Sequence, residues 1–284
     1  MIVNRIDFSM DSNKDAIRVN NLTREYNDTT VLAGVNLIIR EGEFYALMGP
    51  NGSGKTTLTS IIACVRRPSS GNVEIYGKSP DKAKDIIAYI PQDNFSSPYL
   101  TGRENLTYFA GLLGYSKKEA RKIVTEILER IELIKDADKR VSTYSGGMRK
   151  RLEIGTALFP STRILILDEP TTGVDPTGRR EFLGMLNEMC KGDLTVLMTT
   201  HIGTDAEMAT RVGLMDKGRI IAEGQPEELK SKIGLLSIVS VKTAIKTRKS
   251  QMHSRNLTVV NCHLKRIVDT ESILKMRQRQ HPIL

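Results

Sequence analysis

A glycine-rich stretch, "GPNGSGKTT" at residues 49–57, lies between the apolar run "FYALM" and the apolar-periodic run "LTSIIACV". Glycines can adopt the positive φ angles that curl a backbone around an anion, so that successive N–H groups point inward. Lys55 would bring a cation to the β- and γ-phosphates of a nucleotide, and the Thr56 hydroxyl suits Mg²⁺. A plain glycine turn is the alternative. The pattern predicts a loop that binds a nucleoside triphosphate through Gly49, Pro50, Asn51, Gly52, Ser53, Gly54, Lys55, Thr56 and Thr57.

Two acidic residues, Asp168 and Glu169, follow an apolar run in "ILILDEP". Ligands of open α/β sheets bind at the carboxyl ends of the strands, so a buried strand would deliver both carboxylates to such a site. Asp168 is placed to hold Mg²⁺, and Glu169 to orient and deprotonate an attacking water. Help of this kind is typically worth about 10²–10⁴-fold in rate. An acidic strand end that leads into a turn would explain either carboxylate alone, but it explains the pair less well.

A third stretch, "TYSGGMRKRLEIGTAL", places Ser145, Gly146 and Gly147 at the start of an apolar-periodic helix. The N-terminus of a helix is suited to accepting a phosphate, because its first N–H groups have no partner within the helix. By itself this signal is weak, since Ser-Gly-Gly is also an ordinary helix cap.

Taken in their order along the chain, these stretches and four others resemble the nucleotide-binding subunit of ATP-binding-cassette (ABC) transporters. The matching features are Tyr26, "GPNGSGKTT", Gln92 in "AYIPQD", "YSGGMRKRL", "LILDEP", "TGVDP" and His201 in "MTTH". The resemblance covers roughly residues 15–230. It implies an α/β fold of the P-loop NTPase, ABC-type nucleotide-binding class, in which a mixed sheet with helices carries an antiparallel β-subdomain and a helical arm.

The resemblance also implies roles for single residues, with ATP and Mg²⁺ as the ligands. Tyr26 would stack its ring on adenine, Gln92 would touch Mg²⁺ and water while it senses a membrane partner, and His201 would contact the γ-phosphate. Asp175 would communicate across a dimer interface. Each has a plainer alternative: a half-buried aromatic for Tyr26, a surface turn for Gln92, a strand-end histidine for His201 and a helix cap for Asp175. The implied catalytic residues are Glu169, His201 and Gln92, and the implied Mg²⁺ ligands are Thr56, Gln92 and Asp168.

Ser145 and Gly147 cap, in this family, the ATP that another subunit holds, so the resemblance implies a homodimer or a pair of cassette subunits. Two positions depart from the commonest family pattern: Tyr144 replaces leucine, and Met148 replaces glutamine. "YSGGM" and "TTGVDP" are similar to what export-type cassettes carry. We therefore expect an ATPase subunit that powers export through a separate permease, with ATP binding closing the dimer and hydrolysis reopening it.

The region between Gln92 and Pro160 resembles the helical arm, at about residues 93–160, that docks the permease; a simple helical insertion is the alternative. Two other classes of function stay open. A soluble ABC-type ATPase that acts on nucleic acid or ribosomes is one, although such proteins usually carry two cassettes in one chain. A non-hydrolysing regulatory module is the other, and the presence of both Lys55 and Glu169 argues against it.

Short apolar, β-branched runs alternate with amphipathic runs, which is the pattern of a parallel sheet covered by helices. Strands are predicted in "AIRVNNL", "VNLIIR", "EFYALM", "GNVEIYG", "RILILD", "LTVLMTT", "RVGLMD" and "RIIAEG". The clearest helix is "SKKEARKIVTEILERI", where Ser116 and Glu119 form a capping box and the apolar residues recur at helical spacing. Further strands in "LSIVSVKTAIK" and "NLTVVNCHL" and a helix in "TESILKMRQRQ" are predicted near the C-terminus.

Composition favours a soluble, globular protein, because 39% of residues are apolar and the mean hydropathy is −0.26. The resemblance implies a cytoplasmic protein that is peripheral on the cytoplasmic face of the cell membrane. No apolar run approaches the roughly 18 residues of a membrane span, and the N-terminus shows no signal peptide. The three cysteines, Cys64, Cys190 and Cys262, are far apart and indicate no disulfide framework.

Charge is unevenly distributed and suggests a boundary near residue 230, between a cassette at 15–230 and a basic extension at 231–284. From Lys230 onward, twelve Lys and Arg residues face two acids, a net charge of +10; subtracting this from the +9 of the whole chain leaves −1 for residues 1–229. Such a segment is expected near an anionic membrane surface or an acidic loop of the permease, with a solvated surface as the alternative. Nucleic acid is not expected, because this segment has no aromatic residue to stack on bases.

Overall fold

The computed structural model describes residues 14–27, 29–93, 95–192 and 194–232 of the 284-residue chain. The chain divides into two units, Met1–Leu229 and Lys230–Leu284, and of the second unit the structure describes residues 230–232 alone. The strands predicted in "LSIVSVKTAIK" and "NLTVVNCHL" and the helix predicted in "TESILKMRQRQ" lie outside the described residues. The division into a cassette at 15–230 and a basic extension at 231–284 therefore stays a prediction.

A six-stranded sheet lies in the first unit, with the strand order β5-β6-β7-β3-β8-β9. In that order the strands are β5 (Ile87–Ile90), β6 (Ile164–Asp168), β7 (Thr195–Thr200), β3 (Phe44–Met48), β8 (Arg211–Asp216) and β9 (Arg219–Gly224). Neighbours from β5 to β8 are parallel, and β9 is antiparallel to β8. The parallel strands bring their carboxyl ends to one edge, which is where the polar motifs of the sequence follow them.

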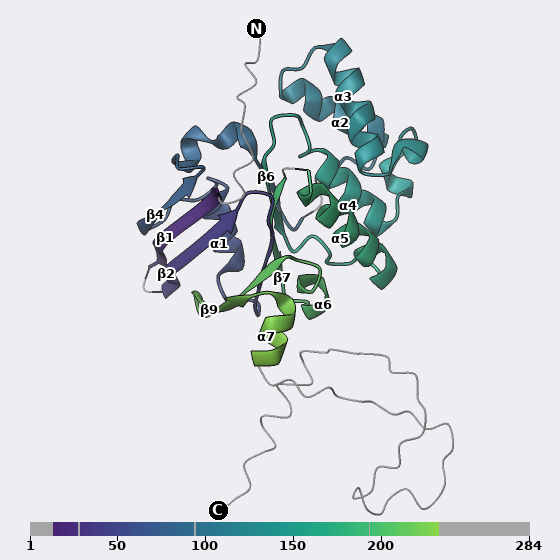
Figure 1. Cartoon of the computed structure of the whole chain (residues 1–284). Coiled ribbons are helices and arrows are strands. Elements are labelled where there is room, and N and C mark those ends of the chain that lie inside the picture. The colour runs from purple at the N-terminus through teal and green to yellow at the C-terminus, as the bar shows by residue number, and fades with distance from the viewer. Residues whose placement is uncertain (1–13, 28, 94, 193, 233–284) are drawn as a thin grey trace, which may run out of the picture. The chain divides into compact units, whose positions relative to one another are not determined.

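A second, antiparallel sheet has the order β2-β1-β4. It consists of β2 (Thr29–Arg40), β1 (Asp15–Tyr26) and β4 (Ser70–Ile75). In Figure 1 these strands lie beside α1 (Lys55–Ile62), which follows the glycine-rich stretch. The two sheets are those expected of a mixed sheet with an antiparallel subdomain.

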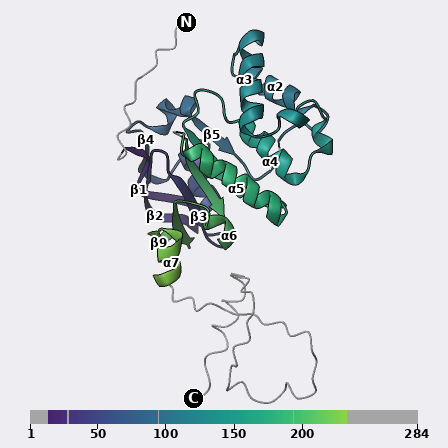
Figure 2. The same ribbon diagram turned by 45° about the vertical axis from the view of Figure 1, so that its right-hand side comes forward.

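Four further helices lie on the other side of the six-stranded sheet (Figures 1 and 2). They are α2 (Gly102–Leu112), α3 (Lys117–Arg130), α4 (Gly146–Gly155) and α5 (Pro176–Cys190), followed by the short α6 (Gly203–Ala206) and by α7 (Pro226–Lys232). Single 3-10 turns occupy Pro80–Lys82, Lys84–Ile86, Ile134–Asp136 and Val141–Thr143. Helices α2 and α3 project away from the strands as an arm, and α4 joins this arm to α5.

Alternation along the parallel strands divides the core into two apolar clusters. Phe44 and Ala46 belong to a cluster that also contains the inward faces of the arm helices. Tyr45 and Leu47, on the opposite face of the same strand, belong to a cluster with α1 and the antiparallel sheet. Side chains of successive strand residues point to opposite faces, so one strand contributes to both clusters. The sheet is therefore covered on both faces, as its continuous apolar runs predict.

The eight strands predicted for this unit are all present, and the predicted helix "SKKEARKIVTEILERI" is α3. Its capping box is confirmed: Ser116 Oγ accepts from the Glu119 N–H, and the Glu119 carboxylate accepts from the Ser116 N–H. Strand β5 was not predicted, because "IAYI" is only four residues long and precedes a proline.

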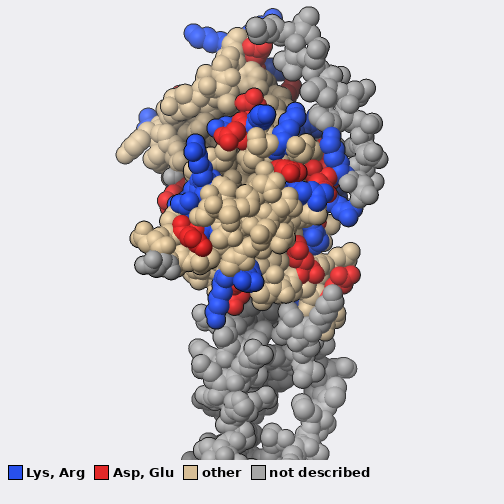
Figure 3. Space-filling view, turned by 90° about the vertical axis from the view of Figure 1, so that its left-hand side faces the viewer, with Lys and Arg blue, Asp and Glu red and all other residues tan. Residues whose placement is uncertain are grey.

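Within residues 14–232, apart from the gaps noted above, no helix is both long and apolar enough to cross a membrane. On the face shown in Figure 3, Lys and Arg side chains are interspersed with Asp and Glu around an uncharged region. This mixture agrees with the net charge of −1 for residues 1–229.

Candidate functional site

The glycine-rich stretch forms a loop between β3 and α1, and its glycines are needed for different reasons. Gly52 and Gly54 have φ angles of +79° and +106°, in the region that favours glycine, and Gly54 is the N-cap of α1. Gly49 has an ordinary φ, but a Cβ there would lie 2.2 Å from the carbonyl oxygen of Met215. Its N–H donates to the Thr200 carbonyl at 3.2 Å. The loop is thus curled by two glycines and pressed against the sheet by a third.

Lys55 points back across the loop and is only 4% exposed. Its Nζ donates hydrogen bonds to the carbonyl oxygens of Gly49 at 2.9 Å and of Pro50 at 3.1 Å. The same nitrogen lies 3.5 Å from Oε1 of Glu169. The cation predicted for a phosphate is therefore at the mouth of the loop, where it meets the predicted base.

The burial of the Ser53 hydroxyl could not be predicted from the sequence. Its side chain is 2% exposed, and its Oγ makes no hydrogen bond within the described residues. A buried hydroxyl without a partner is uncommon in a native fold. A phosphate oxygen would satisfy it, so the loop fits the triphosphate predicted for it. The exposed Asn51, Gly52 and Thr56 and the half-buried Thr57 lie on the same loop or the first turn of α1.

The two carboxylates at the end of β6 have different surroundings. Asp168 is 2% exposed, and its Oδ1 accepts a hydrogen bond from Thr199 Oγ1 at 2.5 Å. Thr199 is its partner in the parallel register of β6 and β7. The Thr199 hydroxyl also accepts from the Glu169 N–H at 3.0 Å, and Glu169 has a φ of +47°. One hydroxyl thus orients Asp168 and fixes the main chain from which Glu169 turns outward.

His201 follows β7 and lies beside Glu169. The distance from His201 Nδ1 to Glu169 Oε2 is 3.2 Å, and the side chain of His201 is 43% exposed. The structure therefore brings Lys55, Glu169 and His201 together from the ends of β3, β6 and β7. Because these residues are far apart in the sequence, their convergence supports one site.

The oxygen ligands predicted for Mg²⁺ suit that ion, which prefers a few protein oxygens completed by substrate phosphates and water. Within the described part of the chain, no group of three or more His, Cys, Asp or Glu side chains is arranged to hold a metal ion. Thr56 is exposed on the first turn of α1, and Gln92 is exposed two residues after β5. The donors present thus fit a site that Asp168 and Thr56 complete with a nucleotide, rather than a site built from protein alone.

Tyr26 lies at the end of β1 between two arginines that the sequence did not single out. Arg66 Nη1 donates to the Tyr26 hydroxyl at 2.6 Å, and the guanidinium carbon of Arg24 lies 4.3 Å from the ring centroid. The hydrogen bonds from Arg66 and Arg24 lower the pKa of the Tyr26 hydroxyl. The ring is half-buried, and its use as an adenine platform stays a prediction. Arginines that stack on a tyrosine leave no periodic signal in a sequence.

Ser145 and Asp175 each begin a helix. Ser145 Oγ accepts from the Met148 N–H at 3.2 Å at the start of α4. The Asp175 carboxylate accepts from the N–H groups of Thr177 at 3.1 Å and Gly178 at 3.0 Å at the start of α5. The bonds from Gly178 and Thr177 lower the pKa of Asp175. Both side chains are exposed caps, and their roles at a dimer interface stay predictions.

The two glycines after Ser145 differ in the space around them. A Cβ at Gly146 would lie 3.4 Å from the carbonyl oxygen of Gly173. A Cβ at Gly147 would meet nothing nearer than the Cα of Gly178 at 3.8 Å, an ordinary contact. The start of α4 thus lies against the "TGVDP" loop, and none of the described residues comes close enough to require glycine at position 147.

Tyr144, one of the departures from the commonest family pattern, ties α4 to the arm. Its side chain is 3% exposed, and its hydroxyl donates to the Asp136 carbonyl at 2.7 Å. A Cβ at Gly102, the first residue of α2, would lie 2.4 Å from this hydroxyl. The tyrosine therefore occupies space that leucine would leave open, and it adds a hydrogen bond.

Asp205 on α6 is a buried carboxylate that contacts Thr171, which follows β6, and Thr200 at the end of β7. It is 0% exposed and accepts hydrogen bonds from the hydroxyls of Thr171 and, at 3.5 Å, Thr200. Arg179 Nε lies 3.7 Å from Asp205 Oδ1. Burial raises the pKa of Asp205, although the Thr171 hydroxyl and the charges of Arg179 and His201 oppose the shift. No motif in the sequence indicates a role for Asp205.

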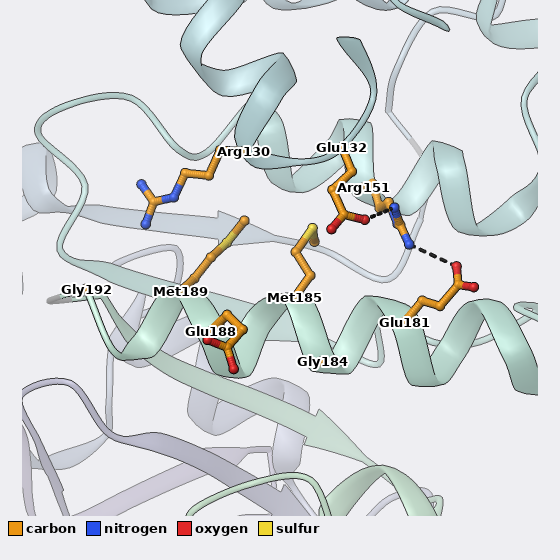
Figure 4. Close-up of a pocket in the computed structure, with 9 residues that line it drawn as sticks. All are labelled: Arg130, Glu132, Arg151, Glu181, Gly184, Met185, Glu188, Met189 and Gly192. Atoms are coloured by element: carbon orange, nitrogen blue, oxygen red, sulfur yellow. Dashed lines mark hydrogen bonds and ion pairs between the residues drawn. The ribbon is translucent and has the colours of Figure 1, made fainter. Parts of the chain in front are cut away.

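An open groove of about 710 Å³ lies between the end of α3, α4 and α5 (Figure 4). Arg151 spans it, with Nη1 2.6 Å from Glu132 Oε2 and Nη2 3.0 Å from Glu181 Oε2. None of the predicted site residues lines this groove. We regard these ion pairs as a link between the arm and α5, since exposed pairs contribute only about 0–1 kcal/mol each.

Comparison with known proteins agrees with this geometry. The family model described as ABC transporter matches residues 32–172. The chain is 33% identical over 260 residues to the linearmycin resistance ATP-binding protein of Bacillus subtilis (strain 168), with 88% of this chain and 84% of that protein covered. It is 37% identical over 224 residues to a daunorubicin resistance ATP-binding protein of Streptomyces coeruleorubidus, with 77% and 71% covered.

Solved structures are similar over most of the described residues. The cassette cbiO1 of Clostridium perfringens, part of the ABC transporter complex cbiONQ, has a TM-score of 0.71 at 31% identity and covers 78% of this chain and 92% of its own. A dimeric ATP-binding cassette bound to ADP and Pi after hydrolysis has a TM-score of 0.65 at 30% identity, with 74% and 98% covered.

Proposed function

This chain belongs to the ABC transporter family as the ATP-binding and hydrolysing subunit of an export system, and we propose that Lys55, Glu169 and His201 are its reaction centre. The observation that carries the proposal is the convergence of these three side chains at the carboxyl ends of parallel strands, with Glu169 3.5 Å from Lys55 Nζ and 3.2 Å from His201 Nδ1. One similar ATP-binding cassette has been solved as a dimer bound to ADP and Pi in a post-hydrolysis state.

Lys55 and Glu169 exchange partners when ATP arrives. In this structure Lys55 Nζ contacts two carbonyl oxygens and the Glu169 carboxylate. A γ-phosphate offers charged oxygens, and charge-assisted hydrogen bonds are roughly twice as strong as neutral ones. Lys55 therefore turns to the phosphate, and Glu169 becomes free to accept a proton from the attacking water. His201 keeps Glu169 in position through Nδ1 and has its other ring nitrogen for the γ-phosphate.

Mg²⁺ would be held by the Asp168 carboxylate, the Thr56 hydroxyl and the Gln92 side chain. When bound, it would neutralise charge on the β- and γ-phosphates of ATP. Thr199 prepares the carboxylate, because its hydroxyl donates to Asp168 Oδ1 and fixes that oxygen. The main-chain N–H groups of the remaining loop residues hold the phosphates, and the buried Ser53 hydroxyl adds a side-chain contact.

Each ATP is shared between two copies of the cassette, either identical or paired. Ser145 and Gly147 begin a helix, and the exposed caps Ser145 and Asp175 leave the start of α4 and the "TGVDP" loop open to another subunit. The N–H groups at a helix start donate hydrogen bonds to an anion. Closure on ATP and reopening after hydrolysis then follow from making and losing these contacts.

The arm is the docking site for the permease. Large apolar side chains are exposed on α2, on its C-cap Leu113 and on the segment before it: Phe95 at 37%, Tyr99 at 83%, Tyr108 at 59%, Leu112 at 65% and Leu113 at 58%. Clusters of exposed apolar groups mark interaction sites. The similar cassette from Clostridium perfringens is part of a transporter complex, which supports a membrane partner for this chain.

The exported substrate is an antibiotic-like molecule. The support is the resistance function printed for relatives that match over most of this chain, against linearmycin and daunorubicin. A cell that expresses this chain with its permease should tolerate such a compound, and the Glu169→Gln variant should not.

The first test of the reaction centre is Glu169→Gln. An amide cannot accept the proton from water, so we expect turnover to fall by about 10²–10⁴-fold while ATP binding persists. ATP should then hold a dimer, visible by size-exclusion chromatography with Mg·ATP. The control is Glu126→Gln on α3, a 59% exposed carboxylate, which should leave turnover unchanged. A Glu169→Gln protein that hydrolyses at the wild-type rate and stays monomeric contradicts the assignment.

A further inference from the structure

A buried ion pair joins α4 to the segment that begins at Gln92. Lys150 and Glu153 are 6% and 0% exposed, and Lys150 Nζ lies 3.1 Å from Glu153 Oε2. The same amine donates a hydrogen bond to the main-chain carbonyl of Gln92 at 3.2 Å. Residues three apart lie on the same face of a helix, so both side chains point toward this segment.

Burying this ion pair costs free energy that an apolar filling of the same space would not. Two charges lose their hydration on burial, and replacing such a pair by apolar residues of similar volume is often neutral or stabilising. Burial also raises the pKa of Glu153, although Lys150, the Phe95 N–H and the Ser96 side chain oppose the shift. Packing alone does not explain the pair, whereas the contact with Gln92 gives Lys150 a specific task.

The same segment is fastened to the arm a few residues later. Asn105 on α2 is 2% exposed, and its side chain both accepts from the Ser97 N–H at 2.8 Å and donates to the Ser97 carbonyl at 3.1 Å. Gln92 is therefore held by α4, and Ser97, five residues later, is held by α2.

We propose that Lys150 and Glu153 are positioning residues that fix the main chain of Gln92 to the helix that begins at Ser145. Glu153 holds the Lys150 amine, and the amine holds the Gln92 carbonyl. This inference rests on the proposed function, since it takes Gln92 as a contact to the nucleotide of this chain and Ser145 as a contact to the nucleotide of the other subunit. One lysine then links the two nucleotide sites of the dimer.

The test is the double variant Lys150→Met/Glu153→Leu, made in the full chain. It replaces the pair by apolar side chains of similar volume, so the melting temperature should stay close to that of the wild type. The Gln92 carbonyl loses its donor, and we expect kcat for ATP to fall by about 10- to 100-fold, the size of effect that a 1 Å misplacement can have. The Kd for ATP, measured on the chain alone by fluorescence, should change by less than about twofold, because Lys55 and the loop are untouched.

A matched control uses an exposed pair on α3. Lys122 and Glu126 are 81% and 59% exposed with 3.8 Å between their charged atoms, and Lys122→Met/Glu126→Leu makes the same chemical change. Its kcat should equal that of the wild type. The single variant Lys150→Met leaves a buried carboxylate unpaired, so its melting temperature should fall, and the double variant should recover it.

Two results would overturn the inference: a stable double variant with wild-type kcat, or one in which the Kd for ATP rises as much as kcat falls. A wild-type chain that hydrolyses no ATP is a different result, because it rejects the proposed function itself. Measuring basal turnover of the wild type first separates the two failures.

Discussion

Glu169 has a left-handed backbone conformation, which is unfavourable for a residue with a side chain, and its neighbours hold it there. A φ of +47° costs a residue with a side chain on the order of 1–2 kcal/mol. The Thr199 hydroxyl, Lys55 and His201 each contact this residue and offset the strain. The carboxylate therefore stands at one defined position beside the loop before ATP arrives, and the chain does not have to order it during the reaction.

Asp205 gives a prediction about pH. Its pKa is raised by burial, so the folded chain holds this proton more tightly than the unfolded chain does. Such a group stabilises the fold below its unfolded pKa of about 3.9, and the contribution is lost as pH rises through the folded pKa. Asp205→Asn cannot titrate. The free energy of unfolding of the wild type, minus that of Asp205→Asn, should therefore fall as pH rises above about 4 and then level off.

Urea unfolding of both proteins across this pH range measures that difference. The groups that face Asp205 are Thr171, Thr200, Arg179 and His201, and none of them is changed by the substitution. A difference that stays constant, or that increases with pH, would show that Asp205 is not destabilised as a carboxylate.

Gly147 gives a prediction about the shared site. A Cβ at this position has ordinary contacts at 3.8 Å inside the chain, so Gly147→Ala should leave the melting temperature within a few degrees or raise it, because alanine favours a helix by roughly 1 kcal/mol. If the start of α4 approaches a nucleotide held by another subunit, the methyl group blocks that approach. We expect ATP binding to persist and ATP-driven dimer formation to weaken by about 10-fold or more, equivalent to about 1.4 kcal/mol.

Gly49→Ala is the contrasting variant, because a Cβ there meets the Met215 carbonyl at 2.2 Å. It should lower both the melting temperature and ATP binding, as a distortion of the loop within one chain would. Analytical ultracentrifugation in the Glu169→Gln background compares the two. A Gly147→Ala protein that dimerises on ATP as well as its parent does would remove Gly147 from the shared site.

At the level of elements, Tyr144 connects the start of α4 to the turn before it. Tyr144→Phe keeps the ring but removes the hydrogen bond to the Asp136 carbonyl, which should cost about 0.5–1.5 kcal/mol of folding free energy. The midpoint of urea unfolding should fall while the m-value stays unchanged. Tyr99→Phe, on a side chain that is 83% exposed, is the control and should change stability by less than about 0.5 kcal/mol. Equal midpoints for the two variants would show that the Tyr144 bond contributes nothing net.

Elements with a strong local pattern could be predicted, and contacts between distant elements could not. Eight strands and α3 follow from apolar runs, alternation and a capping box, whereas β5 is too short for such a pattern. The strand order placed β3 between β7 and β8, although β3 is far from both in sequence. No periodicity contains that information.

The same limit applies to the site. Glycine spacing and the acidic pair pointed to Lys55 and Glu169, and the structure brings them within 3.5 Å. Thr199 could have been found by aligning "LILD" with "VLMT" as neighbouring parallel strands, since it pairs with Asp168. The link from Lys150 to Gln92 spans 58 residues and depends on how the arm packs, so no sequence pattern reveals it.

For the whole molecule, the prediction concerns the basic segment at residues 231–284. Helix α7 ends at Lys232, and Leu229 within it is only 6% exposed, so a truncation should follow Lys232 and not Glu228. The truncated chain keeps every residue of the reaction centre and should keep its basal ATP turnover. It should lose attraction to anionic lipid, which amounts to about 1 kcal/mol for each Lys or Arg near the surface and is screened beyond about 8–10 Å by salt.

Sedimentation with anionic vesicles at low and high salt, full-length against truncated, measures this attraction. Neutral vesicles are the control. Equal, salt-independent recovery of both chains would reject the membrane role, and strong binding of the full-length chain to RNA but not to vesicles would favour a nucleic-acid partner.

The contact between Tyr144 and Gly102 has a consequence for how this protein and its relatives diverge. Because a Cβ at position 102 would lie 2.4 Å from the Tyr144 hydroxyl, a larger residue there requires the tyrosine side chain to shift. A lineage that carries leucine at 144 lacks the hydroxyl and is free to accept alanine there, which favours the start of a helix. Positions 102 and 144 should therefore change together across the family. Position 102 should be glycine where position 144 is tyrosine, and it should be less restricted where position 144 is leucine. Replacing one without the other would pass through a less stable ancestor.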